Sequence, residues 1–564
     1  MSTHARPLAV RLAAASDDEL TALFRARGIK PDAPWQDFFD AAEALLEPAS
    51  IERALVALPL ADAAALLHAA EGHGQATPHL TALALQDPSG LVPVPVAEQV
   101  AGRRLPDVAE EQPQHAASVH DPAPIAERAF TTASRVADML LVAREAPLGL
   151  LATGTLAAGE KKRLAEAGIE QNADDLRTIA EDAGLLSTSD RRVQVTTEAD
   201  AWLGLPFADR WSRLAAAFRR ALPDGVRDGA GWLPPSSWPH AYPWDPSWPD
   251  REAGLRRRAH LLGLTAADGA EPDWAAPLRR GDIVDTASLE QLVPAEVDRV
   301  FLQNDLTAIA PGPLQPALEV RLRGMAERDS AQSSSYRFTA ESIDRALVEG
   351  ETEASVLGFL TALSLTGLPQ PLSYLVGQTA QRHGLVRVWA SETGTVVTSS
   401  DPHLVQAIGI DRGLRPLGLT AEDGMLVSRV SAETVYWAMV DARYPATLVD
   451  DTGNAVSMRR TPPVAQTTAA VPSYASLIAR LRARQGPDAD AAWLDRELEA
   501  AVRAKALLIV DVGMPDGSTR ELVLEATGLG GGRLRGLDRG ANVERTLPVR
   551  SIRAVRLADL PTPD

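Results

Sequence analysis

A predicted helix near the middle of the chain carries side chains of the types that can read nucleic acid. Pro371 opens this helix and Gly384 follows its last residue, His383, and these are the places where proline and glycine are favoured at helix ends. Apolar residues share one face, and polar groups lie on the other. Amides suit the edges of adenine, and arginine suits guanine or phosphate. The inward residues are Leu372, Leu375, Val376 and Thr379, and the predicted nucleic-acid-binding residues are Ser373, Gln378, Gln381 and Arg382.

A structural interpretation of this helix is also open. In that case neighbouring helices cover the polar face, and Arg382 only stabilises the C-terminal end of the helix through its dipole. Burial of Gln378 and Arg382 would favour that interpretation. The strands predicted at 385–389 and 394–398 would complete a winged helix that begins at residue 297.

Arg191 and Arg192 are a second candidate for contact with nucleic acid. They lie in the polar turn between two short strands predicted within residues 184–196. Three predicted helices precede this hairpin, which is the element order of a winged helix. Helix 174–184 then takes the recognition position and the two arginines lie in the wing, where they can contact phosphate.

A third group of candidates consists of arginines near the C-terminus. Five short strands are predicted between Ala506 and Leu557, separated by glycine-rich turns. Arginines alternate with apolar residues there, so several must share one sheet face, which could hold a phosphate or carboxylate effector. The same arginines could equally pair with acidic surface from the rest of the chain. The predicted effector-binding residues are Arg520, Arg533, Arg535, Arg545 and Arg550.

Several kinds of catalytic chemistry have no motif in this sequence. A phosphate-binding Walker loop needs Gly-x4-Gly-Lys-Ser/Thr, and none of the four lysines has that context. There is no Gly-x-Ser-x-Gly or His-Glu-x-x-His pattern, and the absence of cysteine excludes thiolate metal sites. We therefore predict a protein that is not an enzyme and holds no cofactor. The lysines are Lys30, Lys161, Lys162 and Lys505.

One cluster of histidines contains side chains that can bind a metal ion. His68, His73 and His79 are spaced five and six residues apart, so they do not share one helical face well. A carboxylate ligand would also have to come from elsewhere in the chain. We interpret them as loop histidines and predict no metal site.

A segment rich in tryptophan and proline, residues 229–250, allows two interpretations. The prolines forbid helix, so the rings could form an aromatic platform for bases or for a proline-rich partner. Alternatively, the segment is a strap whose rings pack against neighbouring domains, which we favour because buried aromatics are ordinary packing anchors. The rings belong to Trp232, Trp238, Trp244 and Trp248.

Composition predicts an α+β, mostly helical, multidomain protein. With 564 residues the chain exceeds what one core usually organises, and Ala and Leu supply most of its apolar content. The fold class includes two winged-helix-like domains and a small C-terminal β-barrel or sheet. The predicted parts are an N-terminal helical domain (1–90), a linker (91–124), a winged-helix-like domain (125–222), a Trp/Pro strap and helix (223–296), a second winged helix (297–400), a small α/β unit (401–460), a linker (461–472), and helices followed by the β domain (473–564).

Charge and hydropathy limit the partners and the compartment. The net charge of −19 opposes non-specific wrapping of a polyanion, so nucleic acid would need a local basic face. No apolar run is long enough for a secretory signal or a membrane span. We expect a cytoplasmic protein with no membrane partner.

Residues 298–400 resemble a known family. The motifs that support this resemblance are Phe301-Leu-Gln-Asn-Asp-Leu-Thr-Ala-Ile-Ala-Pro-Gly-Pro, Tyr336-Arg-Phe-Thr, Leu368-Pro-Gln-Pro-Leu-Ser-Tyr-Leu-Val and Arg382-His-Gly. They are similar to bacterial helicase-associated proteins, which contain a domain like the N-terminal region of XPB-type DNA repair helicases. The resemblance implies a domain that is associated with helicases in other proteins. It does not imply helicase activity, because this chain lacks the motor itself.

The last strands resemble a diverged WYL domain, a small β-barrel often fused to winged helices and thought to bind nucleic acid or nucleotide-like effectors. Gly532-Arg533-Leu534 matches one motif. The later motif positions fall near Leu547-Pro548 and Arg550-Ser551-Ile552, where the substitutions remove ligand-facing arginines.

Two functions remain open. The first is a non-enzymatic DNA- or RNA-binding accessory or regulatory protein, linked to DNA repair or transcription. The second is a protein–protein scaffold that docks on a helicase or another partner through its winged helices. Helix 371–383 and the basic C-terminal strands favour the first, and the acidic total charge favours the second.

Overall fold

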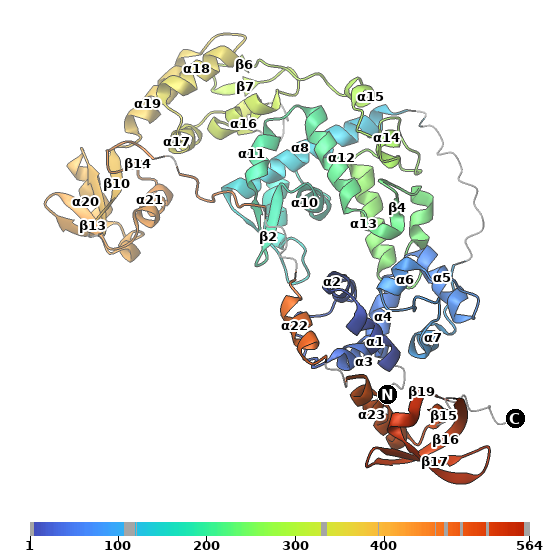
Figure 1. The fold of residues 1–564 in the computed structure, drawn as a ribbon. Helices are drawn as coiled ribbons and strands as arrows, with labels where there is room; N and C mark the ends of the chain where they lie inside the picture. Colours follow the sequence, from blue (N-terminus) through green and yellow to red (C-terminus); the bar gives the residue numbers. More distant parts are fainter. Residues whose placement is uncertain are drawn as a thin grey trace.

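The computed structural model describes residues 5–106, 119, 121–328, 335–392, 394–456, 458–466, 472–485, 489–514 and 518–557. The fold is α+β and mostly helical, as predicted, and its short strands form several small sheets. Buried side chains gather in five separate hydrophobic cores in this part of the chain. Figure 1 shows the corresponding units following one another along an arc.

The N-terminal unit is entirely helical. Its second helix begins with a capping box, because Ser16 Oγ accepts a hydrogen bond from Glu19 N and the Glu19 carboxylate accepts one from Ser16 N. Residues 91–106 are not linker, because a further helix packs Val96 and Val100 into this core. The helices are α1 (Ala5–Ala14), α2 (Asp17–Ala26), α3 (Phe38–Leu46), α4 (Pro48–Val56), α5 (Leu60–Ala70), α6 (Pro78–Ala82) and α7 (Val94–Val100).

The N-terminal unit is completed from the far end of the chain. Helix α22 (Ala475–Ala483) places Tyr474, Leu477 and Leu481 in the same core as α1 to α7. The Tyr474 hydroxyl donates a hydrogen bond to Ile29 O at 2.8 Å. The predicted domain 473–564 therefore divides, with its first helix belonging to the N-terminal unit.

The central unit contains the predicted order of helices and hairpin. Three helices combine with a three-stranded antiparallel sheet in the order β1-β3-β2, and two further helices follow along the chain. The elements are α8 (Ala123–Glu145), β1 (Leu148–Gly149), α9 (Ala158–Glu166), α10 (Ala173–Asp182), β2 (Leu186–Ser189), β3 (Arg192–Val195), α11 (Thr197–Leu203) and α12 (Phe207–Ala221).

The Trp/Pro segment packs as a strap between two units, as predicted. Trp232, Trp238 and Trp248 are buried in the central core, and Trp244 is buried in the N-terminal core. The indole N–H of Trp248 donates to Trp238 O at 2.7 Å, and that of Trp244 donates to Arg104 O at 3.2 Å. The aromatic-platform interpretation is wrong, because buried rings cannot receive bases. The elements of the predicted part 223–296 are β4 (Arg227–Asp228), β5 (Gly231–Trp232), α13 (Trp248–Leu261), α14 (Ala275–Arg279) and α15 (Ala287–Glu290).

The third unit combines a small sheet with four helices, and its core spans residues 297–380. The strands pair antiparallel in the order β6-β7-β9-β8. Thr339 and Thr352 cap two of the helices through their side chains. The elements are β6 (Phe301–Leu302), β7 (Thr307–Ile309), α16 (Pro316–Met325), β8 (Glu327–Arg328), β9 (Ser335–Arg337), α17 (Ala340–Val348), α18 (Glu353–Leu363) and α19 (Gln370–Arg382).

The hairpin that was predicted as the wing of the preceding helices belongs to the fourth unit. Strands β10 and β11 lie in the middle of a five-stranded sheet in the order β12-β13-β11-β10-β14, in which only β10 and β14 run parallel. The predicted boundary at residue 400 therefore separates strands of one sheet. The elements are β10 (Val386–Ser391), β11 (Gly394–Ser399), α20 (Pro402–Ile410), β12 (Thr420–Glu422), β13 (Met425–Ser428), α21 (Ala432–Asp441) and β14 (Ala446–Leu448).

The C-terminal unit contains all five predicted strands in one antiparallel sheet, in the order β18-β17-β16-β15-β19. It is open rather than a barrel, because the edge strands β18 and β19 do not pair within the described residues. Helix α23 (Ala489–Ala504) packs Leu494 and Leu498 against one face. The strands are β15 (Leu507–Gly513), β16 (Thr519–Gly530), β17 (Arg533–Asp538), β18 (Val543–Pro548) and β19 (Ile552–Leu557).

The chain between the fourth unit and α22 is attached to the central unit. Thr197 N donates to Val464 O at 3.0 Å, and Val464 N donates to Val195 O at 3.0 Å. Arg459 pairs with Asp200 of α11 at 2.5 Å. Residues 461–466 of the predicted linker therefore form a fixed extension of the central sheet region. Within the described ranges, no helix combines the length and the apolar character needed to cross a lipid bilayer.

Candidate nucleic-acid interface

Helix α19 presents the predicted polar face to solvent. Leu372 and Val376 are completely buried and Thr379 is buried beside them, which anchors one side of the helix in the third core. On the other side Gln378, Gln381 and Arg382 are exposed, whereas Ser373 is half-buried and so is Leu375 on the inner side. The predicted exposure is confirmed for the two amides and the guanidinium, and neighbouring helices do not cover them. Contact with nucleic acid stays a prediction.

The C-terminal end of α19 is tied to two other elements through His383. Its Nδ1 lies 3.0 Å from Asp344 Oδ1 of α17, and its Nε2 lies 3.1 Å from Thr447 Oγ1 of β14. Gly384 follows with a φ of +74°, which brings its Cα close to Thr447 where a Cβ would be crowded. These contacts of His383 connect the third and fourth units and fix the direction of α19.

Sequence reasoning missed one residue of the exposed face. Tyr374 is 69% exposed and lies one helical turn before Gln378, on the same stripe. Spacings of four, seven and eight residues to Gln378, Gln381 and Arg382 are the signal that would have found it. One acidic group lies beside the stripe, because Glu353 of α18 approaches α19 at Gly377.

Arg191 and Arg192 are both exposed at the tip of the β2–β3 hairpin. Asp190 and Arg191 take left-handed conformations, with φ of 49° and 60°, which a tight two-residue hairpin turn requires. Leu150 N donates a hydrogen bond to Arg191 O, so the turn is held against the segment after β1. Both side chains are exposed to solvent. They belong to the central unit, whereas α19 belongs to the third unit.

Helix α10, predicted as a recognition helix, is acidic and covered. It packs between α8, α12 and α13. Arg257 of α13 pairs with Asp175 at 3.0 Å, and Lys161 of α9 pairs with Asp174 at 2.8 Å. Burial raises the pKa of Asp182, at the end of α10, to about 6. This arrangement stabilises the central unit and leaves no basic helix face for a duplex.

The C-terminal arginines do not share one face. Arg533 and Arg535 point to the side of β17 opposite the buried Leu534 and Gly536. Arg545 of β18 is half-buried and pairs with Asp538 at 2.5 Å, so it has a structural partner. Arg545 is paired with Gly536, so it lies on the opposite side of the sheet from Arg533 and Arg535. The remaining two predicted effector residues, Arg520 and Arg550, are exposed.

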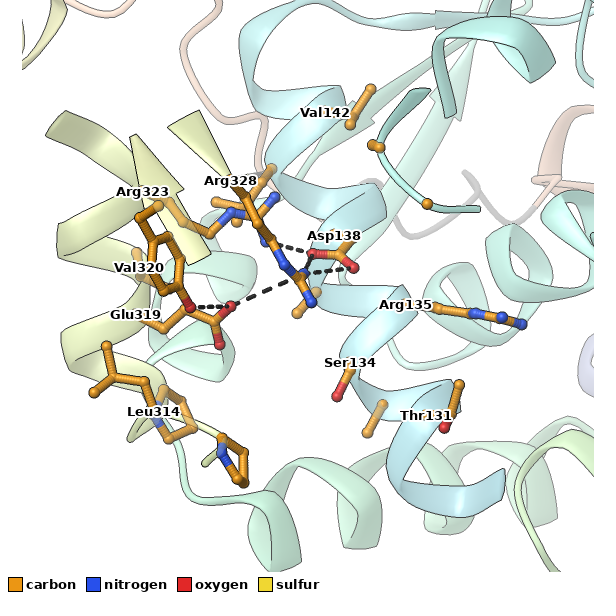
Figure 2. Close-up of a pocket in the computed structure, with 18 of the residues that line it drawn as sticks. Thr131, Ser134, Arg135, Asp138, Val142, Leu314, Glu319, Val320, Arg323 and Arg328 are labelled. Carbon is orange, nitrogen blue, oxygen red and sulfur yellow. Dashed lines mark hydrogen bonds and ion pairs between the residues drawn. The ribbon is translucent and has the colours of Figure 1, made fainter. Parts of the chain in front are cut away.

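A buried charge network joins the central and third units. Asp138, in the middle of α8, is 6% exposed and accepts hydrogen bonds from Arg323 of α16 and Arg328 of β8. Figure 2 shows the two guanidinium groups reaching across the interface to this carboxylate. Arg328 also lies 4.0 Å from Glu319, which accepts a hydrogen bond from the Tyr336 hydroxyl at 3.4 Å.

This network is balanced in charge. Burial alone would lower the pKa of Arg328, but the nearby carboxylates of Asp138 and Glu319 outweigh it and raise the pKa. Sequence reasoning missed Asp138, which stands among buried apolar residues of α8. An acidic residue at the spacing of a buried helix face is the signal that could have found it.

A cleft of about 730 Å³ surrounds the network between α8 and α16. Six arginines and six carboxylates line it, so it has no net charge that would attract a polyanion. The cleft belongs to the joint between the two units.

The histidines of the predicted cluster make two separate contacts. His79 Nδ1 bonds Asp62 at 2.6 Å, and the rings of His68 and His73 lie 5.6 Å apart. Among the described residues no three His, Asp or Glu side chains converge in a way that could hold an ion.

Comparison with known proteins identifies one region. No curated protein sequence matches the chain. A family model described as the helicase conserved C-terminal domain matches residues 300–423, which cover the third unit and the fourth unit as far as β12. This match includes α19 and overlaps the resemblance found in the motifs at 298–400. Residues 300–423 are therefore similar to the helicase conserved C-terminal domain.

Proposed function

We propose that this protein is a non-catalytic, nucleic-acid-binding accessory or regulatory protein, in which the helicase-related region 300–423 supplies the contact. The single observation that carries the proposal is the exposed face of α19 inside that region. Gln378, Gln381 and Arg382 stand on a helix whose other side is locked into a core. Amide and guanidinium groups on a rigid helix suit base edges and phosphate.

The remaining parts fit an accessory role. We extend the proposal to an XPB N-terminal-like character for the matched region and a diverged WYL-like character for the C-terminal sheet. The helix and hairpin order of the central unit favours a winged helix used as scaffold, since its α10 is acidic and covered. A Walker loop needs a lysine in a Gly-x4-Gly-Lys-Ser/Thr pattern, and none of the four lysines of this chain lies in one. This supports a role without a motor.

The second function, docking on a helicase or another protein, is favoured by one observation. The chain carries a net charge of −19, and its charged side chains are extensively paired with one another. A protein partner would not need a basic surface. The two functions differ in salt dependence, because binding to nucleic acid releases counterions and weakens steeply as salt rises.

The test uses the full chain and a fluorescein-labelled 20-residue oligonucleotide, single-stranded or as a blunt duplex. Anisotropy titrations at about 50 and 200 mM salt should show binding that weakens steeply with salt. The double variant Gln378→Ala with Arg382→Ala should bind at least tenfold more weakly than the parent protein.

A matched control removes the same two residue types elsewhere in the matched region. Gln406 and Arg415 are exposed on the fourth unit, away from α19. Gln406→Ala with Arg415→Ala should leave the affinity unchanged. Equal losses in both double variants, or no binding by the parent protein at low salt, would overturn the proposal.

A further inference from the structure

Only two aromatic side chains of this protein are exposed. The chain has 11 Trp, 9 Phe and 6 Tyr, and all of them lie within the described residues. Phe301 is 41% exposed and Tyr374 is 69% exposed, whereas every other Trp, Phe and Tyr ring is buried or half-buried. Both exposed rings belong to the region similar to the helicase domain. The exposed Phe and Tyr rings are therefore confined to the region that contains the proposed contact surface.

Phe301 is held outward by its strand. Val300 forms a parallel bridge with Ser364, and both of these residues are buried. Because side chains alternate along extended backbone, the next residues on each side, Phe301 and Leu365, point outward together. Leu365 is 52% exposed, and its N–H donates to Val300 O at 2.9 Å.

Tyr374 lies close to this pair along the chain. Gln370, the first residue of α19, follows Leu365 by five positions, and extended chain covers at most roughly 18 Å over that length. Tyr374 follows four residues into the helix, which adds about 6 Å. Figure 1 shows β6 and α19 within the same unit. A few nucleotides of a single strand can span such a distance.

We infer that the exposed face of α19 binds single-stranded nucleic acid, and that bases of the same strand stack on Tyr374 and Phe301. The inference rests on the proposed function and names its substrate class. Rings of this kind are sequence-tolerant platforms, because every base has a π-face that can stack on them. In a duplex those faces are already stacked on neighbouring bases, so an exposed aromatic side chain gains little there.

The rest of the stripe fits the same ligand. Beyond Tyr374, Gln378 and Gln381 can bond the edges of unpaired bases, and Arg382 can contact phosphate. The stripe itself contains one cation and no acidic residue. Glu353 of α18 lies on the flank of the stripe at Gly377.

The experiment compares variants of the full chain by anisotropy with two probes, fluorescein-labelled oligo(dT) of 20 residues and a blunt 20-base-pair duplex. Tyr374→Ala should weaken binding to oligo(dT) about tenfold, and Phe301→Ala should weaken it several-fold. Tyr374→Phe keeps a ring and should bind within about twofold of the parent protein. Ile410→Ala is the control, because Ile410 is 74% exposed in the same region and has no ring.

The outcomes separate this inference from the function on which it rests. If Gln378→Ala with Arg382→Ala weakens binding and Tyr374→Ala does not, the proposed function stands and the stacking inference is wrong. Tighter binding of the duplex than of oligo(dT) by the parent protein would also overturn the inference. Binding of neither probe would overturn both. Hydrogen exchange of α19 peptides in each variant checks that this helix remains folded.

Discussion

Removing the charge of Asp138 should loosen the joint between the central and third units. In Asp138→Asn the side chain keeps its size, but Arg323 and Arg328 lose the carboxylate that both of them contact. Breaking a buried ion pair by removing one partner costs about 3–5 kcal/mol. The side chains of Arg323 and Arg328 are 16% and 25% exposed, so water can partly replace the lost partner. We therefore expect a cost near the lower end, about 3 kcal/mol.

Hydrogen exchange followed by mass spectrometry suits this test, because unfolding of a chain with five cores is not a single transition. A loss of about 3 kcal/mol in the free energy of opening makes exchange roughly a hundredfold faster. This acceleration should be confined to peptides from α8, α16 and β8. Peptides from α2, which lies in another core, should exchange as in the parent protein.

The control for this prediction is an exposed ion pair of α16, the helix that also carries Arg323. Arg321 of α16 pairs with Glu351, and its side chain is 42% exposed. Exposed pairs contribute about 0–1 kcal/mol, so Glu351→Gln should change exchange in α16 by less than about fivefold. If Asp138→Asn has an effect as small as that of Glu351→Gln, the reasoning about the buried network is refuted.

Three further outcomes can be checked separately. The pKa of Asp182 is raised to about 6 from an ordinary 3.8, so the folded chain keeps a proton that the unfolded chain releases, and the free energy of unfolding falls as the pH rises from about 4 to 6. Asp182→Asn should remove this fall and stabilise the central unit at pH 7.5 by on the order of 2 kcal/mol but not at pH 4. Hydrogen exchange of α10 peptides, corrected for the intrinsic exchange rate at each pH, measures this gain, and equal gains at both pH values would contradict the prediction. Glu353→Gln should strengthen binding to oligo(dT) about twofold to fivefold at low salt and less at high salt, and an unchanged affinity would show that this carboxylate does not face the ligand. Purified protein should hydrolyse no ATP with or without DNA, and turnover that a point mutation in this chain abolishes would show the opposite.

Features that depend on neighbouring residues were predictable from the sequence. The capping box at Ser16, the buried side of α19 and the five C-terminal strands follow from spacing and turn residues within about a dozen positions. The tryptophan strap was also predictable, because large rings separated by prolines have few ways to avoid water other than packing.

Features that depend on distant residues were not predictable. The β10–β11 hairpin has the pattern of a wing, and only its partners β13 and β14 make it the centre of a sheet. Asp138 meets Arg323 across 185 positions of sequence. The open sheet instead of a barrel depends on whether β18 and β19 meet, which alternation along each strand does not determine.

Helix α22 has a consequence for the order in which this protein is made. Its Tyr474 ring packs edge-on against Phe24 with centroids 5.9 Å apart, and Arg480 Nε donates to Trp35 O at 3.0 Å. These contacts bridge about 445 positions, which a ribosome needs roughly 20 to 90 s to synthesise. During that time the N-terminal helices exist without the helix that closes their core. A ribosome that pauses before Tyr474 therefore leaves the apolar side chains around Phe24 open to solvent and to chaperones.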